Sequence, residues 1–146
     1  MSEGTGQPAP FELAWMESLE IGVPDIDRDH KILIEDANAI ARALAGSRGR
    51  DVIVDLVGKM RRNCMAHFRR EEEILRRDRF GELEAHAAEH RRIETEIDDI
   101  KNTLETIDGP EPMVRELALS FRTLLIDHLL RYDLRYKSHL MDRRGR

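Results

Sequence analysis

Apolar residues recur every three or four positions in four long segments of the chain. This period places apolar side chains on one face of an α-helix, so each segment is predicted to be an amphipathic helix. Gly22 and Pro24 lie just before the first segment, and turns containing Gly, Asp or Pro separate the others. The predicted helices cover about residues 24–46, 51–77, 82–107 and 111–139.

Short turns join only neighbouring helices, so the four helices are expected to run alternately up and down. The predicted fold is all-α, an up-down-up-down antiparallel four-helix bundle with an N-terminal arm. Residues 1–10 have no helical period and are predicted to be a flexible lead, and residues 11–146 are predicted to form a single domain. The arm is expected to pack across the bundle through the apolar residues Phe11, Leu13, Trp15, Met16 and Leu19.

The apolar faces of these helices also contain polar residues. Five of the six histidines and two carboxylates fall at inward positions: His30, His67, Glu71, His86, His90, His128 and Asp133. A single inward histidine is ordinarily a core residue bonded to a backbone carbonyl, but five such residues fit that explanation poorly. Buried carboxylates are rarer still unless they are paired or bound to a metal.

These seven polar residues are expected to lie in one layer of the bundle. In an antiparallel pair of helices, two residues are level when the turn between them lies midway along the chain. The turn at residues 47–50 lies midway between His30 and His67, and the next two turns lie midway between the polar residues that they separate. An explanation based on ordinary core histidines does not predict this agreement.

The composition of the chain favours a helical fold and argues against nucleic-acid binding. Charged residues make up 36% of the 146 residues and aromatic residues 5%, which suits long amphipathic helices better than a sheet. The formal net charge of -5 argues against nucleic-acid binding, because affinity for phosphate backbones depends on basic surface.

Cys64 is the one cysteine and is expected to be a core thiol. With no signal-peptide pattern and no apolar run of membrane-spanning length, we expect a soluble cytoplasmic protein without a membrane span.

Five imidazoles and two carboxylates are too many ligands for one metal ion and suit a pair of ions. Imidazole together with carboxylate favours zinc, iron, copper or manganese over magnesium and calcium. If both carboxylates and one solvent oxygen bridge two octahedral ions, the five histidines leave one coordination position vacant. The pattern therefore indicates a metal site that could bind a small molecule.

The order and spacing of the seven residues resemble the ligand signature of the hemerythrin family, in particular its single-domain bacterial members. The signature reads His30, then His67-x-x-x-Glu71, then His86-x-x-x-His90, then His128-x-x-x-x-Asp133. The sequences around Trp15, His30 and His67 are also similar to those of the family. The resemblance extends over about residues 11–140.

This resemblance implies reversible dioxygen binding by two irons, as in an oxygen carrier, store or delivery protein rather than an enzyme. The irons would be bridged by Glu71, Asp133 and an oxo or hydroxo group. One iron would be held by His86, His90 and His128, and the other, with the vacant position for dioxygen, by His30 and His67. By the same resemblance Leu125 would form the wall of the oxygen pocket.

The sequence argues against two other functions of metal-binding proteins and leaves a third open. A carboxylate-rich di-iron oxidase requires Glu-x-x-His pairs, and none of the five inward histidines has Glu three residues before it. A zinc hydrolase of the His-Glu-x-x-His type would need Glu at position 87, which is Ala87. An oxygen or redox sensor that acts through a separate protein would share the same site and stays an alternative. The sequence identifies no protein partner.

The spacing between His128 and Asp133 is unusual for a regular helix, since five residues turn through about 140° from the starting face. We therefore expect an irregularity between these residues, such as a π-bulge, which is often found at functional sites. Tyr132 and Tyr136 are expected to be packing residues, although one of them could hydrogen bond to a ligand.

Overall fold

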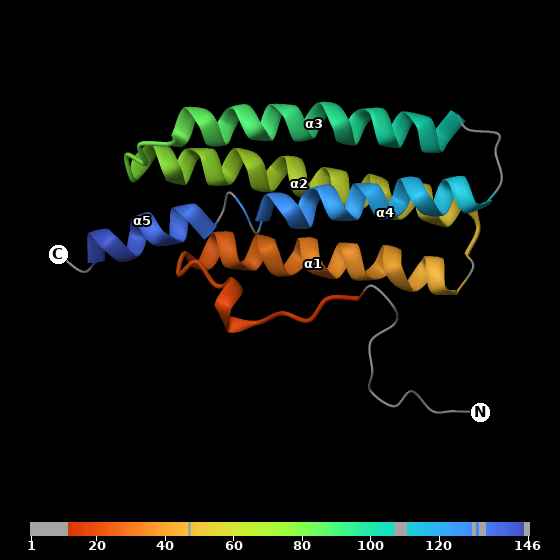
Figure 1. Cartoon of the computed structure of the whole chain (residues 1–146), viewed down its shortest axis with the longest axis horizontal. Helices are drawn as coiled ribbons and strands as arrows, with labels where there is room; N and C mark the ends of the chain where they lie inside the picture. Colours follow the sequence, from red (N-terminus) through yellow and green to blue (C-terminus); the bar gives the residue numbers. More distant parts are fainter. Residues whose placement is uncertain (1–11, 47, 107–110, 130, 132–133, 145–146) are drawn as a thin grey trace.

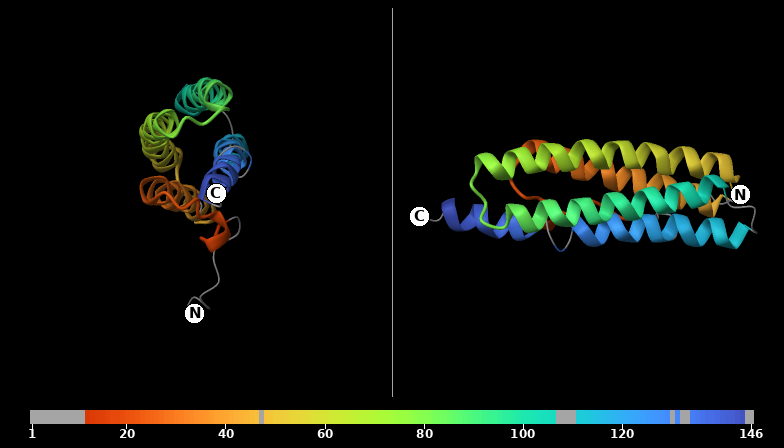
Figure 2. Two further views of the ribbon diagram at one scale, coloured as in Figure 1. Left: turned by 90° about the vertical axis from the view of Figure 1, so that its left-hand side faces the viewer. Right: turned by 90° about the horizontal axis from the view of Figure 1, so that it is seen from above.

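The computed structural model describes residues 12–46, 48–106, 111–129, 131 and 134–144. Its regular elements are all helical: η1 (Glu17–Leu19), α1 (Pro24–Ala45), α2 (Arg50–Arg77), α3 (Leu83–Thr106), α4 (Glu111–His128) and α5 (Leu134–Arg144). The helices α1 to α4 lie side by side, and successive helices run in opposite directions (Figure 1). Viewed from one end, they surround a common centre (Figure 2). The predicted all-α bundle is confirmed.

The start of α1 shows how local sequence fixes the first helix. Pro24 occupies a first-turn position, where the missing backbone N–H of proline would have no partner within the helix. The carboxylate of Asp27 accepts hydrogen bonds from the backbone N–H groups of Ile21 (2.7 Å) and Gly22 (3.1 Å). Gly22 has a φ of 95°, which glycine adopts without strain. These contacts fix the preceding chain to the first turn of α1.

The N-terminal arm runs along α1 (Figure 1). The side chain of Asn38 exchanges two hydrogen bonds with the backbone of Leu13, each 2.7 Å long. The predicted packing of the arm is confirmed for Leu13 and Trp15, which are partly buried. It is wrong for Met16, which is 56% exposed and belongs to neither apolar cluster of the bundle. Residues 1–11 lie outside the described part of the chain.

The interior of the bundle contains two apolar clusters. The larger one includes buried residues of α1 to α4, among them Leu33, Phe68, Ile93 and Leu125. The smaller one comprises Ile21, Ile26, Ile74, Leu75, Phe80 and Tyr136. Along the chain the described ligands lie between residues of the two clusters: His30 between Ile26 and Leu33, His67 and Glu71 between Cys64 and Ile74, His86 and His90 between Phe80 and Ile93, and His128 between Leu125 and Tyr136. The predicted polar layer is therefore enclosed between two apolar clusters.

The fourth predicted helix, 111–139, is not continuous. The helix α4 ends at His128, Leu129 and Arg131 have π-helical conformation, and α5 begins at Leu134. The expected irregularity is thus confirmed, and the helical part extends further than predicted. In a regular helix Tyr136 would be rotated by about 80° from His128, whereas a π-bulge reduces this offset to about 20°. Accordingly the side chains of His128 and Tyr136 are both buried, with exposed fractions of 3% and 0%.

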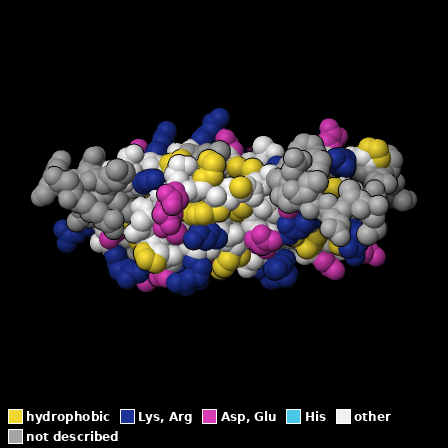
Figure 3. Space-filling model, turned by 90° about the horizontal axis from the view of Figure 1, so that it is seen from below, with side chains coloured by type: hydrophobic (Ala, Val, Ile, Leu, Met, Phe, Trp, Pro, Cys, Tyr) yellow, Lys and Arg dark blue, Asp and Glu magenta, His cyan; other side chains and the backbone are white. Residues whose placement is uncertain are grey.

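The surface of the bundle is mixed in character. On the face shown in Figure 3, apolar side chains lie among Lys, Arg, Asp and Glu side chains, and no histidine is visible. No helix in the described ranges is long and apolar enough to cross a membrane.

Candidate metal centre

Six of the seven predicted ligands meet in the polar layer of the bundle, and all six are buried. They come from four helices: His30 from α1, His67 and Glu71 from α2, His86 and His90 from α3, and His128 from α4. The four-residue spacing within α2 and within α3 places both side chains of each pair on the same helix face. The seventh predicted residue, Asp133, lies outside the described residues.

The six residues divide into two groups that share one carboxylate. His86, His90 and His128 form a three-histidine group with Glu71, and His30 and His67 form a two-histidine group with the same Glu71. Within each group the potential ligand atoms lie within 4.8 Å of one another.

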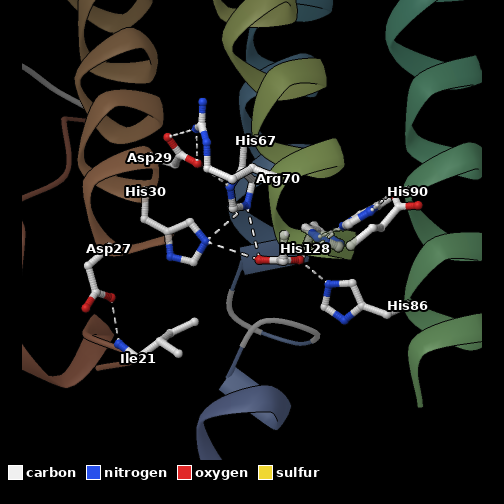
Figure 4. Close-up of polar contacts among 11 residues, drawn as sticks. Ile21, Asp27, Asp29, His30, His67, Arg70, His86, His90 and His128 are labelled. Carbon is white, nitrogen blue, oxygen red and sulfur yellow. Dashed lines mark hydrogen bonds and ion pairs between the residues drawn. The ribbon is translucent and has the colours of Figure 1, made fainter. Parts of the chain in front are cut away.

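Each oxygen of the Glu71 carboxylate faces one of these groups. Oε2 lies 3.2 Å from Nε2 of His67 and 3.8 Å from Nε2 of His30. Oε1 lies 3.2 Å from Nε2 of His90 and also contacts Nε2 of His86. Figure 4 shows His30, His67 and His86 directed toward one another from α1, α2 and α3. Glu71 is therefore placed to bridge two ions.

The distances between imidazole nitrogens fit metal coordination. The Nε2 atoms of His30 and His67 are 3.2 Å apart, and those of His90 and His128 are also 3.2 Å apart. Two ligand atoms that bind one ion at about 2.1 Å and at right angles are about 3 Å apart. The separations match adjacent ligands on one ion in both groups.

His67 is held from outside the layer by Asp29 of α1. Its Nδ1 lies 3.2 Å from Oδ2 of Asp29, and the same carboxylate accepts hydrogen bonds from Arg70. Burial alone would raise the pKa of Asp29, but the hydrogen bonds from His67 and Arg70 outweigh it and lower that pKa below its ordinary value. Asp29 is therefore an ionised acceptor, and Nδ1 of His67 carries the proton.

His90 is held in the corresponding way by Glu72 of α2. Its Nδ1 lies 2.8 Å from Oε2 of Glu72, and Nη2 of Arg91 donates to the other carboxylate oxygen at 2.5 Å. Glu72 is 8% exposed, so its carboxylate lies at the edge of the interior while Arg91 extends toward solvent. In both arrangements a histidine contacts a carboxylate, and that carboxylate accepts a hydrogen bond from an arginine.

Four residues around the layer were not predicted from the sequence: Asp29, Arg70, Glu72 and Arg91. A signal was available, since each of these residues is adjacent in sequence to a predicted ligand. Adjacent residues on a helix point about 100° apart, so a residue next to a ligand does not lie on the ligand's face of the helix. It contacts the layer only through a ligand on a neighbouring helix. That contact requires the three-dimensional arrangement.

The donor set of the layer fits a bound cation. In the neutral form of His67 and His90, an Nδ1 that donates outward leaves the Nε2 lone pair facing inward. These lone pairs face the oxygens of Glu71 at 3.2 Å, and two acceptors at that distance repel each other. A cation between them would convert the repulsion into attraction.

Apolar side chains enclose the layer on the side of the larger cluster. Phe68 stacks on the ring of His90, with centroids 3.9 Å apart and an angle of 10° between the planes. Leu125, the predicted wall of the oxygen pocket, is 5% exposed and belongs to the same cluster. Cys64 is completely buried in this cluster, in agreement with its prediction as a core thiol.

Tyr136 and His139 of α5 lie at the end of the bundle next to the layer. The hydroxyl of Tyr136 donates to the carboxylate of Asp78, and the ring packs against Phe80 at 5.4 Å. The predicted packing role of Tyr136 is confirmed, whereas Tyr132 lies outside the described residues. His139 also packs on Phe80, with ring centroids 5.1 Å apart.

The chain matches a known protein family. The family model described as "Hemerythrin HHE cation binding domain" matches residues 21–140. This chain belongs to the hemerythrin family.

Two relatives within the hemerythrin family match most of the chain. A bacteriohemerythrin of Clostridium acetobutylicum is 25% identical over 125 residues, which is 84% of this chain and 96% of the relative. A myohemerythrin of Theromyzon tessulatum is 24% identical over 134 residues, which is 91% of this chain and 96% of the relative. The match to the family model, residues 21–140, covers all of the helices that contribute to the polar layer.

Proposed function

We propose that this chain binds two iron ions in its polar layer and uses them to bind dioxygen reversibly. The observation that carries the proposal is the division of the buried ligands into two groups that share Glu71. The three-histidine group would hold one iron and the two-histidine group the other. Glu71 and Asp133 would bridge the irons beside an oxo or hydroxo group.

The unequal groups support binding of a small molecule at one of the two ions. With the same bridging groups, the ion at His30 and His67 would have one protein ligand fewer than the other ion. Its vacant position is the proposed site for dioxygen. When bound, the irons would supply the electrons that dioxygen accepts on binding and returns on release.

The surrounding residues would make that exchange reversible by excluding water. Leu125 and Phe68 belong to a continuous apolar cluster next to the layer, and both are almost completely buried. Such an apolar wall leaves protons and solvent anions without a polar route from that side. We therefore infer that the protein carries, stores or delivers dioxygen and is not an enzyme.

An anaerobic-to-aerobic optical spectrum of the iron-loaded protein tests this proposal. We expect a new absorption band on adding oxygen that disappears when oxygen is removed and returns in further cycles. Irreversible oxidation in the first cycle would contradict reversible binding. A change of fold on oxidation, measured by circular dichroism, would favour the alternative of a sensor that signals to a partner.

A further inference from the structure

We propose that Asp29 and Glu72 are positioning residues that hold His67 and His90 in the tautomer required for metal binding. Arg91 contacts Oε1 of Glu72 and leaves Oε2 facing His90, so it determines which oxygen of that carboxylate faces the ring. The inference rests on the proposed function for the identity of the metal, but the tautomers themselves are a property of the metal-free chain.

The contacts define the role of each carboxylate. Oδ2 of Asp29 lies 3.2 Å from Nδ1 of His67, and Oε2 of Glu72 lies 2.8 Å from Nδ1 of His90. A carboxylate that is ionised can only accept a hydrogen bond, so each Nδ1 must carry the proton. The Nε2 atom of each ring then keeps its lone pair for the ion.

Arg91 makes the arrangement at His90 sensitive to a substitution that barely changes shape. In Glu72→Gln, Arg91 would hold the amide oxygen at the position of Oε1, because a guanidinium has only donors. The amide NH₂ would then face His90 as a donor and require an unprotonated Nδ1. The proton would move to Nε2, the nitrogen that faces the other ligands. Arg70 contacts both oxygens of Asp29 through Nη1, so it does not select the orientation of the amide in Asp29→Asn.

A purely structural role of these ion pairs predicts something different. If the carboxylates only joined helices, then any comparable ion pair between helices should be equally important. Asp98 provides the matched control, because it accepts a hydrogen bond from Nε of Arg61 at 2.6 Å and so joins α3 to α2. Asp98→Asn removes an ion pair between helices without altering a contact to His67 or His90.

The first test reads the tautomers in metal-free protein. Nitrogen-15 NMR of the histidine side chains at about pH 8 should show a protonated Nδ1 on both His67 and His90. Glu72→Gln should shift the proton of His90 to Nε2 and leave His67 unchanged. An unprotonated Nδ1 on either ring in the unmodified protein, or a tautomer of His90 unaffected by Glu72→Gln, would overturn the inference.

The second test measures retention of ferrous iron, added under anaerobic conditions, against a competing chelator. Glu72→Gln should weaken binding of one of the two irons by about 10- to 100-fold, the usual effect of losing a group that orients a metal ligand. Asp98→Asn should leave the affinity unchanged. Thermal unfolding of the metal-free variants shows whether each chain is folded.

A double variant separates positioning from a structural role most sharply. In Glu72→Gln with Arg91→Gln, the amide at position 72 is free to turn its oxygen toward His90, so iron affinity should recover relative to Glu72→Gln alone. A further loss in the double variant would contradict positioning and indicate that the ion pair itself matters. If the tautomers are as expected but the unmodified protein does not bind two irons, the proposed function fails while the positioning role stands.

Discussion

At the scale of single residues, the buried Glu71 is the most informative side chain. It has 0% exposure, and its two oxygens face histidines from α1, α2 and α3. A buried carboxylate costs stability unless it has charged or hydrogen-bonding partners. Its position between two histidine groups explains why the helices keep a charge in their interior.

Leu125 provides a test of the proposed pocket wall. Leu125→Ala should destabilise the fold by about 2–5 kcal/mol, because it leaves a cavity in the larger apolar cluster. It should also accelerate irreversible oxidation of the iron-loaded protein, because water gains access to the site. Leu104→Ala, in the same cluster but distant from the ligands along α3, is the control for stability alone. Equal oxidation rates in the two variants, measured optically, would argue against a shielding role for Leu125.

Asp36 provides a prediction about pH. Burial raises the pKa of Asp36 above its ordinary value of 3.8, despite a hydrogen bond from Asn63 and the nearby charge of Lys59. The folded state therefore binds this proton more tightly than the unfolded state does. The resulting stability is fully present below the ordinary pKa and is lost as the pH rises through the raised one.

Asp36→Asn removes this pH-dependent contribution, since the amide does not ionise. Urea unfolding at several pH values between about 3.5 and 7 should show the variant gaining stability relative to the unmodified protein as the pH rises. A stability difference that stays constant over this range would contradict the assigned pKa direction.

At the scale of helices, the interruption after α4 allows both His128 and Tyr136 to face the interior. The smaller apolar cluster depends on this arrangement, because Tyr136 packs there with Phe80 and Ile26. The hydroxyl of Tyr136 also donates to Asp78 at the end of α2. Tyr136 thus attaches α5 to the bundle both by packing and by a hydrogen bond.

Tyr136→Phe should therefore loosen α5 without removing the apolar contact. We expect a loss of about 1–3 kcal/mol, the usual contribution of a hydrogen bond to a charged group. Amide hydrogen exchange should become faster in α5, whereas the iron content should stay the same. Unchanged exchange in α5 would indicate that the hydroxyl contributes nothing to docking of this helix.

The helices were predictable because their signals are local. The apolar period, Pro24 at the first helical turn and the turns between helices all depend on neighbouring residues. The helix bounds of α1 to α3 accordingly differ from the prediction by one residue at each end or less. The exposure of Met16 and the split of the fourth helix depend instead on contacts between segments distant in sequence.

The layer was predictable in part for the same reason. Antiparallel helices of equal rise bring residues equidistant from a turn to one level, and His30 and His67 meet as this rule predicts. The contacts of Asp29 and Glu72 could not be derived in this way. They depend on the rotation of each helix about its own axis, which the sequence pattern defines only coarsely.

At the scale of the whole molecule, the bundle encloses a polar layer between two apolar clusters. Each cluster contains residues from several helices, so the layer is assembled only when the bundle has folded. Metal binding should then stabilise the folded state, because an ion that binds only the folded chain shifts the unfolding equilibrium. The same enclosure separates the proposed oxygen site from bulk water.

The most direct test of the central claim is the ratio of iron to protein after anaerobic loading with ferrous iron and removal of the excess. The two histidine groups that share Glu71 predict two irons per chain. A ratio of one or less in folded protein would contradict the account, because the second group would then have no ion to bind.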